Sequence, residues 1–298
     1  MKTLLVILGP TGVGKTALSL SVAEVLGTEI VNADSRQIYR ELPIGTAAPT
    51  PQEQARVRHW FVGTHSVTED YNAGMYERDA LAVIRRLFLT HDTVVMTGGS
   101  MMYIDAVCHG FDELPTVSRE VRETVRREYE KGGMGWLQAE AKRVDPKYFA
   151  MADRSNPQRL LHAVEITRTA GVPYSTLRKG CTAQREFRIV RTGLRRERSE
   201  LYERINRRVL DMMSLGLEEE ARRVYPLRQG LNSLNTVGYK ELFAFFDGQT
   251  TRDEAVALIQ QHSRNYAKRQ LTWWRNNAND IVWFDADKVT AEELTAVV

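Results

Sequence analysis

The chain begins with a short, unbroken run of apolar residues and continues with apolar residues at helical spacing. Residues 4–8 are all apolar, which is typical of a strand buried on both faces, and a glycine-rich turn follows them. Over residues 15–26, Ala17, Leu18, Val22 and Val25 recur at helical intervals. The pattern therefore predicts a strand, a loop and a helix, in that order.

Further apolar runs along the chain predict four more strands, which helical patterns separate. These strands are expected over residues 29–33, 93–97, 188–194 and 280–284. Helices are expected over residues 76–89, 199–224 with an interruption at Gly216, and 253–276. Apolar strands that alternate with helices indicate a parallel α/β sheet covered on both sides.

About ninety residues between the third and fourth predicted strands show no strand pattern, so we expect a helical insertion there. Its helices are predicted over 117–129, 134–144 and 157–170. The last should begin with Asn156 as N-cap and Pro157 at the first helical position, and end near Gly171. The predicted organisation is an α/β core over residues 1–111 and 184–298 with a helical domain inserted over 112–183.

Composition places the chain among folded globular proteins, since 43% of its residues are hydrophobic and 27% charged. The net charge of +3 conceals an asymmetry: residues 117–208 hold 22 Lys and Arg against 12 Asp and Glu. Such a basic segment suits a polyphosphate backbone, although an exposed arginine-rich helical surface explains the count equally well. Cys108 and Cys181 lie far apart without metal-ligand spacing, so both are expected to be unpaired thiols.

The N-terminal apolar run is too short to span a membrane, and no signal-peptide cleavage pattern follows it. We therefore expect a cytoplasmic protein without membrane attachment. Because the sequence contains no coiled-coil heptads, we also expect a monomer.

The turn after the first strand carries a phosphate-binding motif, G-x-x-x-x-G-K-[ST], in its expected place between a strand and a helix. Glycines there let backbone N–H groups turn inward around a diphosphate, and the helix N-terminus adds positive potential. The lysine supplies a cation, and the threonine hydroxyl can ligate Mg²⁺. The diphosphate site is therefore predicted at Gly9, Pro10, Thr11, Gly12, Val13, Gly14, Lys15 and Thr16.

A second candidate group follows the second predicted strand. Asp34 lies at the carboxyl end of that strand, where ligands gather in parallel α/β sheets, so it should project into the same crevice as the P-loop. A carboxylate beside a diphosphate is unfavourable unless a metal or an incoming nucleophile uses it, which favours a general base or a metal-associated role. Gln37 offers a donor and an acceptor suited to the edge of a base. The strand over 93–97 ends in Thr and Gly rather than in the metal-holding Asp of a nucleotide hydrolase.

Beyond these two sites, an ordered series of motifs resembles the bacterial tRNA dimethylallyltransferases, also called tRNA isopentenyltransferases. The series covers nearly the whole chain: GPTGVGKT (9–16), DSRQIY (34–39), IGTAAPT (44–50), YNAGMYERDA (71–80), GGSMMYIDAV (98–107), NPQRLLHAVEI (156–166), VGYKE (237–241) and YAKRQLTWWRN (266–276). A P-loop alone is shared by many proteins, whereas this ordered set is specific. The fold implied is a P-loop α/β core with an inserted helical domain.

The resemblance implies transfer of a dimethylallyl group from dimethylallyl diphosphate to N6 of the adenine 3′-adjacent to the anticodon of a tRNA. It implies catalytic roles for Lys15, Thr16, Asp34 and Ser100, with Mg²⁺ as cofactor at Thr16. Two positions depart from the usual family pattern, because Met101 replaces a Gly and His162 an Arg. Contacts to the tRNA anticodon stem-loop are expected from Asp34, Ser35, Arg36, Gln37, Ser100, Arg122, Gln158, Arg159, His162, Lys268, Arg269, Gln270 and Arg275.

The helix over 253–276 supports an RNA role by its own spacing. Arg264, Lys268 and Arg275 share one stripe with Leu271, and such a basic stripe with aromatic neighbours can follow a phosphate backbone. Three alternatives stay open: an isopentenyltransferase acting on AMP, ADP or ATP, a P-loop small-molecule kinase, and a non-catalytic nucleotide switch or RNA-binding module. Only the first of these would also use Asp34 and an allylic diphosphate.

Overall fold

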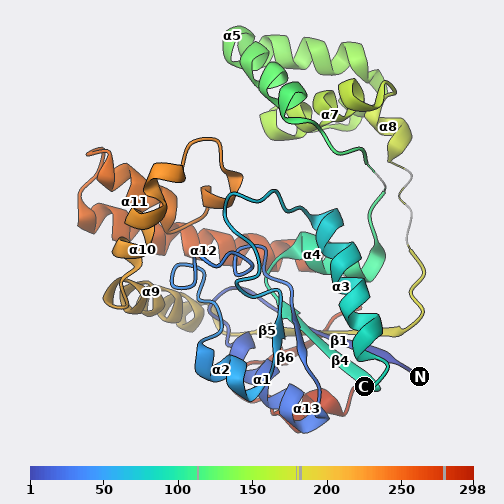
Figure 1. Cartoon of the computed structure of the whole chain (residues 1–298), viewed down its shortest axis with the longest axis vertical. Coiled ribbons are helices and arrows are strands. Elements are labelled where there is room, and N and C mark those ends of the chain that lie inside the picture. Colours follow the sequence, from blue (N-terminus) through green and yellow to red (C-terminus); the bar gives the residue numbers. More distant parts are fainter. Residues whose placement is uncertain (113, 179, 181–182, 278–279) are drawn as a thin grey trace. The chain divides into compact units, whose positions relative to one another are not determined.

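Six parallel strands form the central sheet of the computed structural model, which describes residues 1–112, 114–178, 180, 183–277 and 280–298. The strand order is β3-β2-β4-β1-β5-β6, and each neighbouring pair is parallel (Figure 1). The predicted parallel α/β sheet is confirmed. The strands are β1 (Thr3–Leu8), β2 (Ile30–Asn32), β3 (His59–Trp60), β4 (Thr93–Gly98), β5 (Arg188–Arg195) and β6 (Val282–Asp285).

Strand β1 lies in the middle of the sheet and is buried on both faces. Leu4 and Val6 pack into one hydrophobic cluster together with residues of helices α3 (Ala73–Leu87) and α4 (Met101–His109). Leu5 and Ile7 pack into a second cluster together with residues of α1 (Lys15–Leu26) and α13 (Ala291–Thr295). Figure 1 shows α1 beside α13 and α3 beside α4. The alternating strand residues thus hold a helical layer on each face.

Among the remaining helices of this unit, those over the predicted stretches 199–224 and 253–276 are confirmed, whereas α2 (Pro51–Arg56) and α11 (Tyr239–Phe246) were not predicted. Gly216, with φ of 98°, ends the long helical stretch and separates two helices, as predicted. Thr251 starts the C-terminal long helix with a capping box, because Glu254 N–H donates to its hydroxyl at 3.3 Å and its own N–H donates to the Glu254 carboxylate at 2.7 Å. The confirmed helices are α9 (Arg198–Ser214), α10 (Leu217–Val224) and α12 (Arg252–Asn277).

Residues 109–184 form a separate compact unit, and residues 1–108 with 185–298 form the other. The predicted insertion was 112–183. Within this helical unit, Asn156 caps a helix as expected by accepting the Arg159 N–H at 3.3 Å, and Gly171 ends it with φ of 70°. The two helices predicted over 117–129 and 134–144 are present and follow each other within 119–144, with a kink between them at Gly133, whose φ of 62° and ψ of −163° are not helical. The unit contains α5 (Arg119–Val144), α6 (Pro146–Met151), α7 (Pro157–Ala170) and α8 (Tyr174–Leu177).

The basic segment 117–208 is divided between the two units, since β5 and the part of α9 that this segment contains belong to the sheet unit. In the helical unit, part of its charge is neutralised locally: Arg168 bridges Glu128 and Glu140, and Arg143 also pairs with Glu140. Side-chain hydrogen bonds from Arg143 and then from Arg168, opposed by partial desolvation, lower the pKa of Glu140 to about 2.

A smaller prediction concerns the two cysteines. Cys108 is buried and unpaired, whereas Cys181 lies outside the described residues. Trp274 is buried in the core, and Asp285 is the last residue of β6. In the described part of the chain, every helix is too short or too polar to cross a membrane.

Candidate active site

The P-loop joins β1 to α1 and takes the conformation that its glycines allow. Gly12 has φ of 82° and Gly14 has φ of 116°, both in the region that glycine adopts without steric cost. A Cβ on Gly12 would lie 2.8 Å from Ile205 Cγ1, so the loop also needs glycine there to pack against α9. The loop therefore presents backbone N–H groups at the N-terminus of α1, where an anion binds.

Lys15 turns its ammonium group back onto its own loop. Its Nζ donates to the carbonyl oxygens of Gly9 at 2.8 Å and Pro10 at 3.0 Å. Burial lowers the pKa of Lys15 to about 8, although the nearby Asp34 carboxylate raises it, and Arg208 lowers it slightly further. Lys15 and Asp34 line the same cavity, as the sequence predicted, and the charge of Asp34 acts on the lysine.

A second cation, Arg208 of α9, reaches the P-loop and was missed by the sequence analysis. Its guanidinium donates to the hydroxyl of Thr11, and its Nε is buried without a hydrogen-bond partner among the described residues. Burial lowers the pKa of Arg208, and Asp34 opposes that shift. A buried guanidinium with unused donor capacity beside a P-loop fits an anionic ligand. The signal available in the sequence was the run of arginines at 204, 207 and 208 among buried apolar positions of one helix.

Asp34 follows β2 and closes a tight turn. Its Oδ1 accepts the backbone N–H of Arg36 at 2.9 Å and of Gln37 at 3.3 Å. Both bonds fix the carboxyl group in one orientation, while its Oδ2 receives no hydrogen bond from the described residues. Such a carboxylate is held in place and still has an oxygen to accept a proton.

Ser100 fixes the same turn from the neighbouring strand. Its buried hydroxyl oxygen accepts the Ser35 N–H at 2.7 Å and lies 2.9 Å from the Ser35 hydroxyl. Gly98, at the end of β4, has to be glycine because an added Cβ would lie 2.2 Å from the Ala33 carbonyl oxygen. Ser35, Arg36 and Ser100 do not line the cavity, so the contacts of Ser100 are those of a support for the Asp34 turn.

Gln37 does not offer the free amide that the sequence analysis expected. Its Nε2 donates to the carbonyl oxygens of Thr46 at 3.1 Å and Ala47 at 3.0 Å. The 44–50 loop thus uses both N–H groups of Gln37 in the structure, while its Oε1 can still accept, and a contact between Gln37 and a base edge stays a prediction. Arg36 is engaged as well, through bonds of 3.3 Å to the carbonyls of Asn232 and Ser233.

The 44–50 loop is anchored by a buried carboxylate. Glu220 of α10 accepts the N–H groups of Ile44 at 2.9 Å and Gly45 at 2.8 Å, and the Tyr239 hydroxyl at 2.6 Å. Three neutral donors thus satisfy a carboxylate that is fully buried. Held this way, the loop gives the cavity an apolar wall together with α9, formed by Ile44, Ala47, Ala48, Pro49, Met212 and Leu215.

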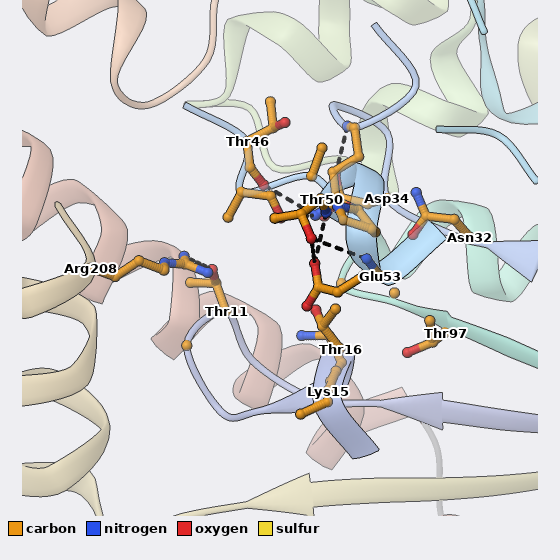
Figure 2. Close-up of a pocket in the computed structure, with 18 of the residues that line it drawn as sticks. Thr11, Lys15, Thr16, Asn32, Asp34, Thr46, Thr50, Glu53, Thr97 and Arg208 are labelled. Carbon is orange, nitrogen blue, oxygen red and sulfur yellow. Dashed lines mark hydrogen bonds between the residues drawn. The ribbon is translucent and has the colours of Figure 1, made fainter. Parts of the chain in front are cut away.

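All these parts surround one cavity of about 760 Å³, here called the P-loop cavity. Lys15, Thr16, Asp34 and Arg208 line it together. Figure 2 shows Arg208 meeting Thr11 on one side, with Lys15, Thr16 and Asp34 arranged around the same space. The predicted juxtaposition of the P-loop and the carboxylate after β2 is therefore present in the structure. A cavity with cations, one fixed carboxylate and an apolar wall can hold a small anionic ligand that has an apolar tail.

Two side chains of α12 also line the P-loop cavity. Tyr266 is partly buried beside it, and burial raises the pKa of its hydroxyl to about 12. Gln270 is buried and hydrogen-bonded to both the P-loop and Gly99, so its assignment to a tRNA contact disagrees with its surroundings.

The other predicted tRNA contacts on α12, Lys268, Arg269 and Arg275, are exposed. Arg264 bonds to Asn206 of α9 and so is not part of a free basic stripe.

In the helical unit, three predicted residues line a second hollow, of about 530 Å³, here called the aromatic cleft. They are Gln158, Arg159 and His162, all on α7. Tyr148 and Tyr174 pack edge to face in it, and the Arg178 guanidinium lies 6.0 Å and 5.7 Å from their ring centres. Arg122 does not line the cleft, although its charge acts on His162, whose pKa is lowered first by partial desolvation and second by Arg122.

The described residues contain no group of three or more His, Cys, Asp or Glu side chains that could hold a metal ion. An ion in the P-loop cavity would have to take most of its ligands from phosphate oxygens and water. Mg²⁺ commonly binds in that way, with few protein ligands. The hydroxyl of Thr16, which lines the cavity, is compatible with one such ligand.

Comparison with known proteins adds three findings. The family model described as IPP transferase matches residues 37–277. The chain is 56% identical over 290 residues to tRNA dimethylallyltransferase 2 of Porphyromonas gingivalis, covering 97% of this chain and 96% of that protein. It is 54% identical over 288 residues to tRNA dimethylallyltransferase 1 of Phocaeicola vulgatus, covering 97% and 95%.

Among solved structures, the full-length tRNA isopentenylpyrophosphate transferase of Bacillus halodurans matches with a TM-score of 0.71 and 33% identity, covering 100% of this chain and 94% of that one. A eukaryotic dimethylallyltransferase acting on tRNA matches with a TM-score of 0.77 over 96% of this chain and 74% of that one. Its identity is 22%, so this second likeness concerns the fold.

Proposed function

The chain belongs to the IPP transferase family, and from that premise we propose that it transfers the dimethylallyl group of dimethylallyl diphosphate to N6 of the adenine 3′-adjacent to the anticodon of a tRNA. One observation carries the assignment of the site. The P-loop, two cations and the fixed carboxylate of Asp34 line a single cavity, so a leaving diphosphate and a reacting amine can meet there.

The reaction places its demands on two ends of that cavity. As the bond between the allylic carbon C1 and the bridging oxygen breaks, diphosphate leaves with the electron pair. Lys15, Arg208 and the P-loop N–H groups stabilise the charge that grows on it. When bound, Mg²⁺ at Thr16 would neutralise part of the same charge. To contact the diphosphate, the Lys15 ammonium group must release the carbonyl oxygens of its own loop, to which it donates in the structure.

At the other end, N6 of adenine attacks C1 and loses one proton. Adenine N6 is a weak nucleophile because its lone pair is delocalised into the ring, so the step needs a positioned base. Asp34 accepts the proton on the carboxyl group that the Arg36 and Gln37 N–H groups hold in place. Ser100 keeps this turn fixed through Ser35.

The apolar wall accommodates the five-carbon chain and limits access of water to an allylic carbon with carbocation character. The wall keeps its place because Glu220 anchors the 44–50 loop. We extend the proposal to the partner: the anticodon stem-loop is bound through the aromatic cleft and through Lys268, Arg269 and Arg275 of α12. We further propose a monomeric enzyme, acting in the cytoplasm.

Incubation with labelled dimethylallyl diphosphate and unmodified tRNA, followed by nucleoside analysis, tests the function. We expect label in N6-dimethylallyladenosine from tRNA, and no label in AMP, ADP or ATP offered in competition. Label in the free nucleotides instead would identify an adenylate isopentenyltransferase. Phosphate transfer from ATP without any prenylated product would identify a kinase.

A further inference from the structure

We propose that Gln270 is a positioning residue that ties the Thr11 peptide of the P-loop to Gly99 and so holds the diphosphate cations and the Asp34 turn in one arrangement. The proposal rests on the proposed function for the identity of the anion. It replaces the expectation that Gln270 contacts tRNA.

The amide of Gln270 fits its two partners in only one orientation. The side chain is 1% exposed; its Oε1 accepts the Thr11 N–H at 2.8 Å, and its Nε2 donates to the Gly99 carbonyl oxygen at 2.7 Å. One partner is a donor and the other an acceptor, so only a group that carries both functions at this spacing satisfies them. The Thr11 N–H is partly buried, and the buried Gly99 carbonyl otherwise receives only a long bond of 3.5 Å from the Tyr266 hydroxyl, so loss of the amide removes the short bond that each group makes.

At the P-loop end, the bond fixes the residue that positions Arg208. Thr11 gives its N–H to Gln270, and its hydroxyl accepts from the Arg208 guanidinium. A displaced Thr11 therefore displaces the hydroxyl on which Arg208 rests. In this way Gln270 acts on the diphosphate through Thr11 and Arg208.

At the other end, the bond fixes the segment that supports Asp34. A Cβ added to Gly99 would lie 2.6 Å from Gln270 Nε2 and 3.8 Å from Lys15 Nζ, so the amide fills the space that glycine leaves open. The next residue, Ser100, binds the N–H of Ser35, which follows Asp34. A single side chain thus connects the anion-binding loop with the support of the general base.

The same helix provides a matched control. Gln260 also lies on α12, and its side-chain amide also donates to a backbone carbonyl, that of Asn206 at 3.2 Å. Gln260 does not line the P-loop cavity. Replacing either glutamine by methionine keeps the side-chain length and removes the amide, so the two variants differ mainly in what that amide holds.

The test compares Gln270→Met with Gln260→Met and wild type in three measurements: calorimetric binding of inorganic diphosphate, binding of an unmodified anticodon stem-loop RNA, and single-turnover transfer from dimethylallyl diphosphate. For Gln270→Met we expect diphosphate affinity and transfer rate each to fall about tenfold, the scale of one lost buried hydrogen bond, with RNA affinity unchanged. For Gln260→Met we expect wild-type values in all three.

Unchanged diphosphate affinity in Gln270→Met, or a loss of RNA affinity alone, overturns the inference. If the wild-type protein makes no prenylated adenine, the proposed function is wrong, while the diphosphate measurement still tests the positioning role of Gln270. The two failures are therefore distinguishable.

A second variant keeps the inference testable if Gln270→Met does not fold. In Gln270→Glu, the protonated carboxyl can donate to the Gly99 carbonyl, whereas the carboxylate cannot. The ratio of the variant's transfer rate to that of wild type should therefore rise as the pH falls from about 8 to about 5.5, where a buried Glu gains its proton. A ratio that stays constant over that range contradicts the proposal.

Discussion

The P-loop cavity and the aromatic cleft differ in how their polar groups are held. In the cavity, the groups that face the ligand are fixed by hydrogen bonds within the protein: Asp34 by two backbone N–H groups of its own turn, the 44–50 loop by Glu220 of a distant helix, and the P-loop by Gln270 of another. In the cleft, Gln158, Arg159 and His162 are exposed on one face of α7, beside two tyrosine rings.

This difference matches what each region has to do. Charge that develops in a reaction is stabilised best by groups that need no reorganisation, and apart from Lys15, which has to release its loop carbonyls, the cavity is built in that way. Binding an RNA loop needs cations and aromatic faces that adapt to a flexible ligand, and the cleft supplies those. We therefore expect substitutions in the cavity to change turnover, and substitutions in the cleft to change tRNA affinity and its salt dependence.

The largest effect is expected at Asp34 in the cavity. We expect Asp34→Asn to lower single-turnover transfer by roughly a hundredfold to ten-thousandfold, the usual range for a lost general base, with diphosphate and tRNA affinities nearly unchanged. Asp211→Asn is the matched control, because Asp211 is a second carboxylate that lines the same cavity but is exposed. Equal rates for the two variants would remove Asp34 from its role.

A smaller loss is expected at Arg208. Arg208→Met should lower the transfer rate by about a hundredfold, the lower end of the cost of losing one donor that stabilises developing negative charge. It should also weaken binding of inorganic diphosphate. Arg198→Met changes an exposed arginine at the start of the same helix that does not line the P-loop cavity, and it should stay near wild type in both measurements. The same losses in both variants would mean that general surface charge, and not the buried guanidinium, is responsible.

The titration of Lys15 should appear as an alkaline limb. Burial lowers the pKa of its ammonium group to about 8, so below that pH the lysine is charged and above it the charge is lost. We therefore expect kcat/KM for dimethylallyl diphosphate to fall by about tenfold per pH unit above that value. Lys15→Arg stays charged over this range, so the same limb in that variant would assign the titration to another group.

The smallest effect is expected in the aromatic cleft. Arg159→Ala should weaken anticodon stem-loop binding a few-fold and reduce the slope of log affinity against log salt by about one, with turnover at saturating tRNA unchanged. Arg127→Ala is the control, because Arg127 is an exposed arginine of the same unit that does not line the cleft. A slope that stays the same in Arg159→Ala would exclude a phosphate contact there.

Local sequence signals predicted the framework of the site well. The β1–P-loop–α1 segment has a motif whose spacing dictates its own backbone, and Asp34 lies where parallel strands end, so both were found without tertiary information. The ends of helix α7 were predicted from Asn156 as N-cap and from Gly171. Strand β3 was missed because two residues carry no periodicity.

What escaped prediction depends on contacts between distant segments. Arg208 reaches Thr11 across 197 residues, and Gln270 reaches it across 259 residues. No local pattern shows which arginine of an arginine-rich helix, or which face of α12, turns toward the P-loop. The hydrogen bonds between Gln37 and the 44–50 loop were not predicted for the same reason, since that loop is positioned by Glu220 of a remote helix.

The P-loop and Asp34 should serve one reaction in one cavity. A crystal structure with an unreactive thiolo analogue of dimethylallyl diphosphate is the most direct test. We expect the diphosphate to contact Lys15 and Arg208. We also expect the five-carbon chain to lie along the wall formed with the 44–50 loop, with C1 facing the Asp34 side. A diphosphate in the P-loop whose chain points away from Asp34 would contradict this expectation.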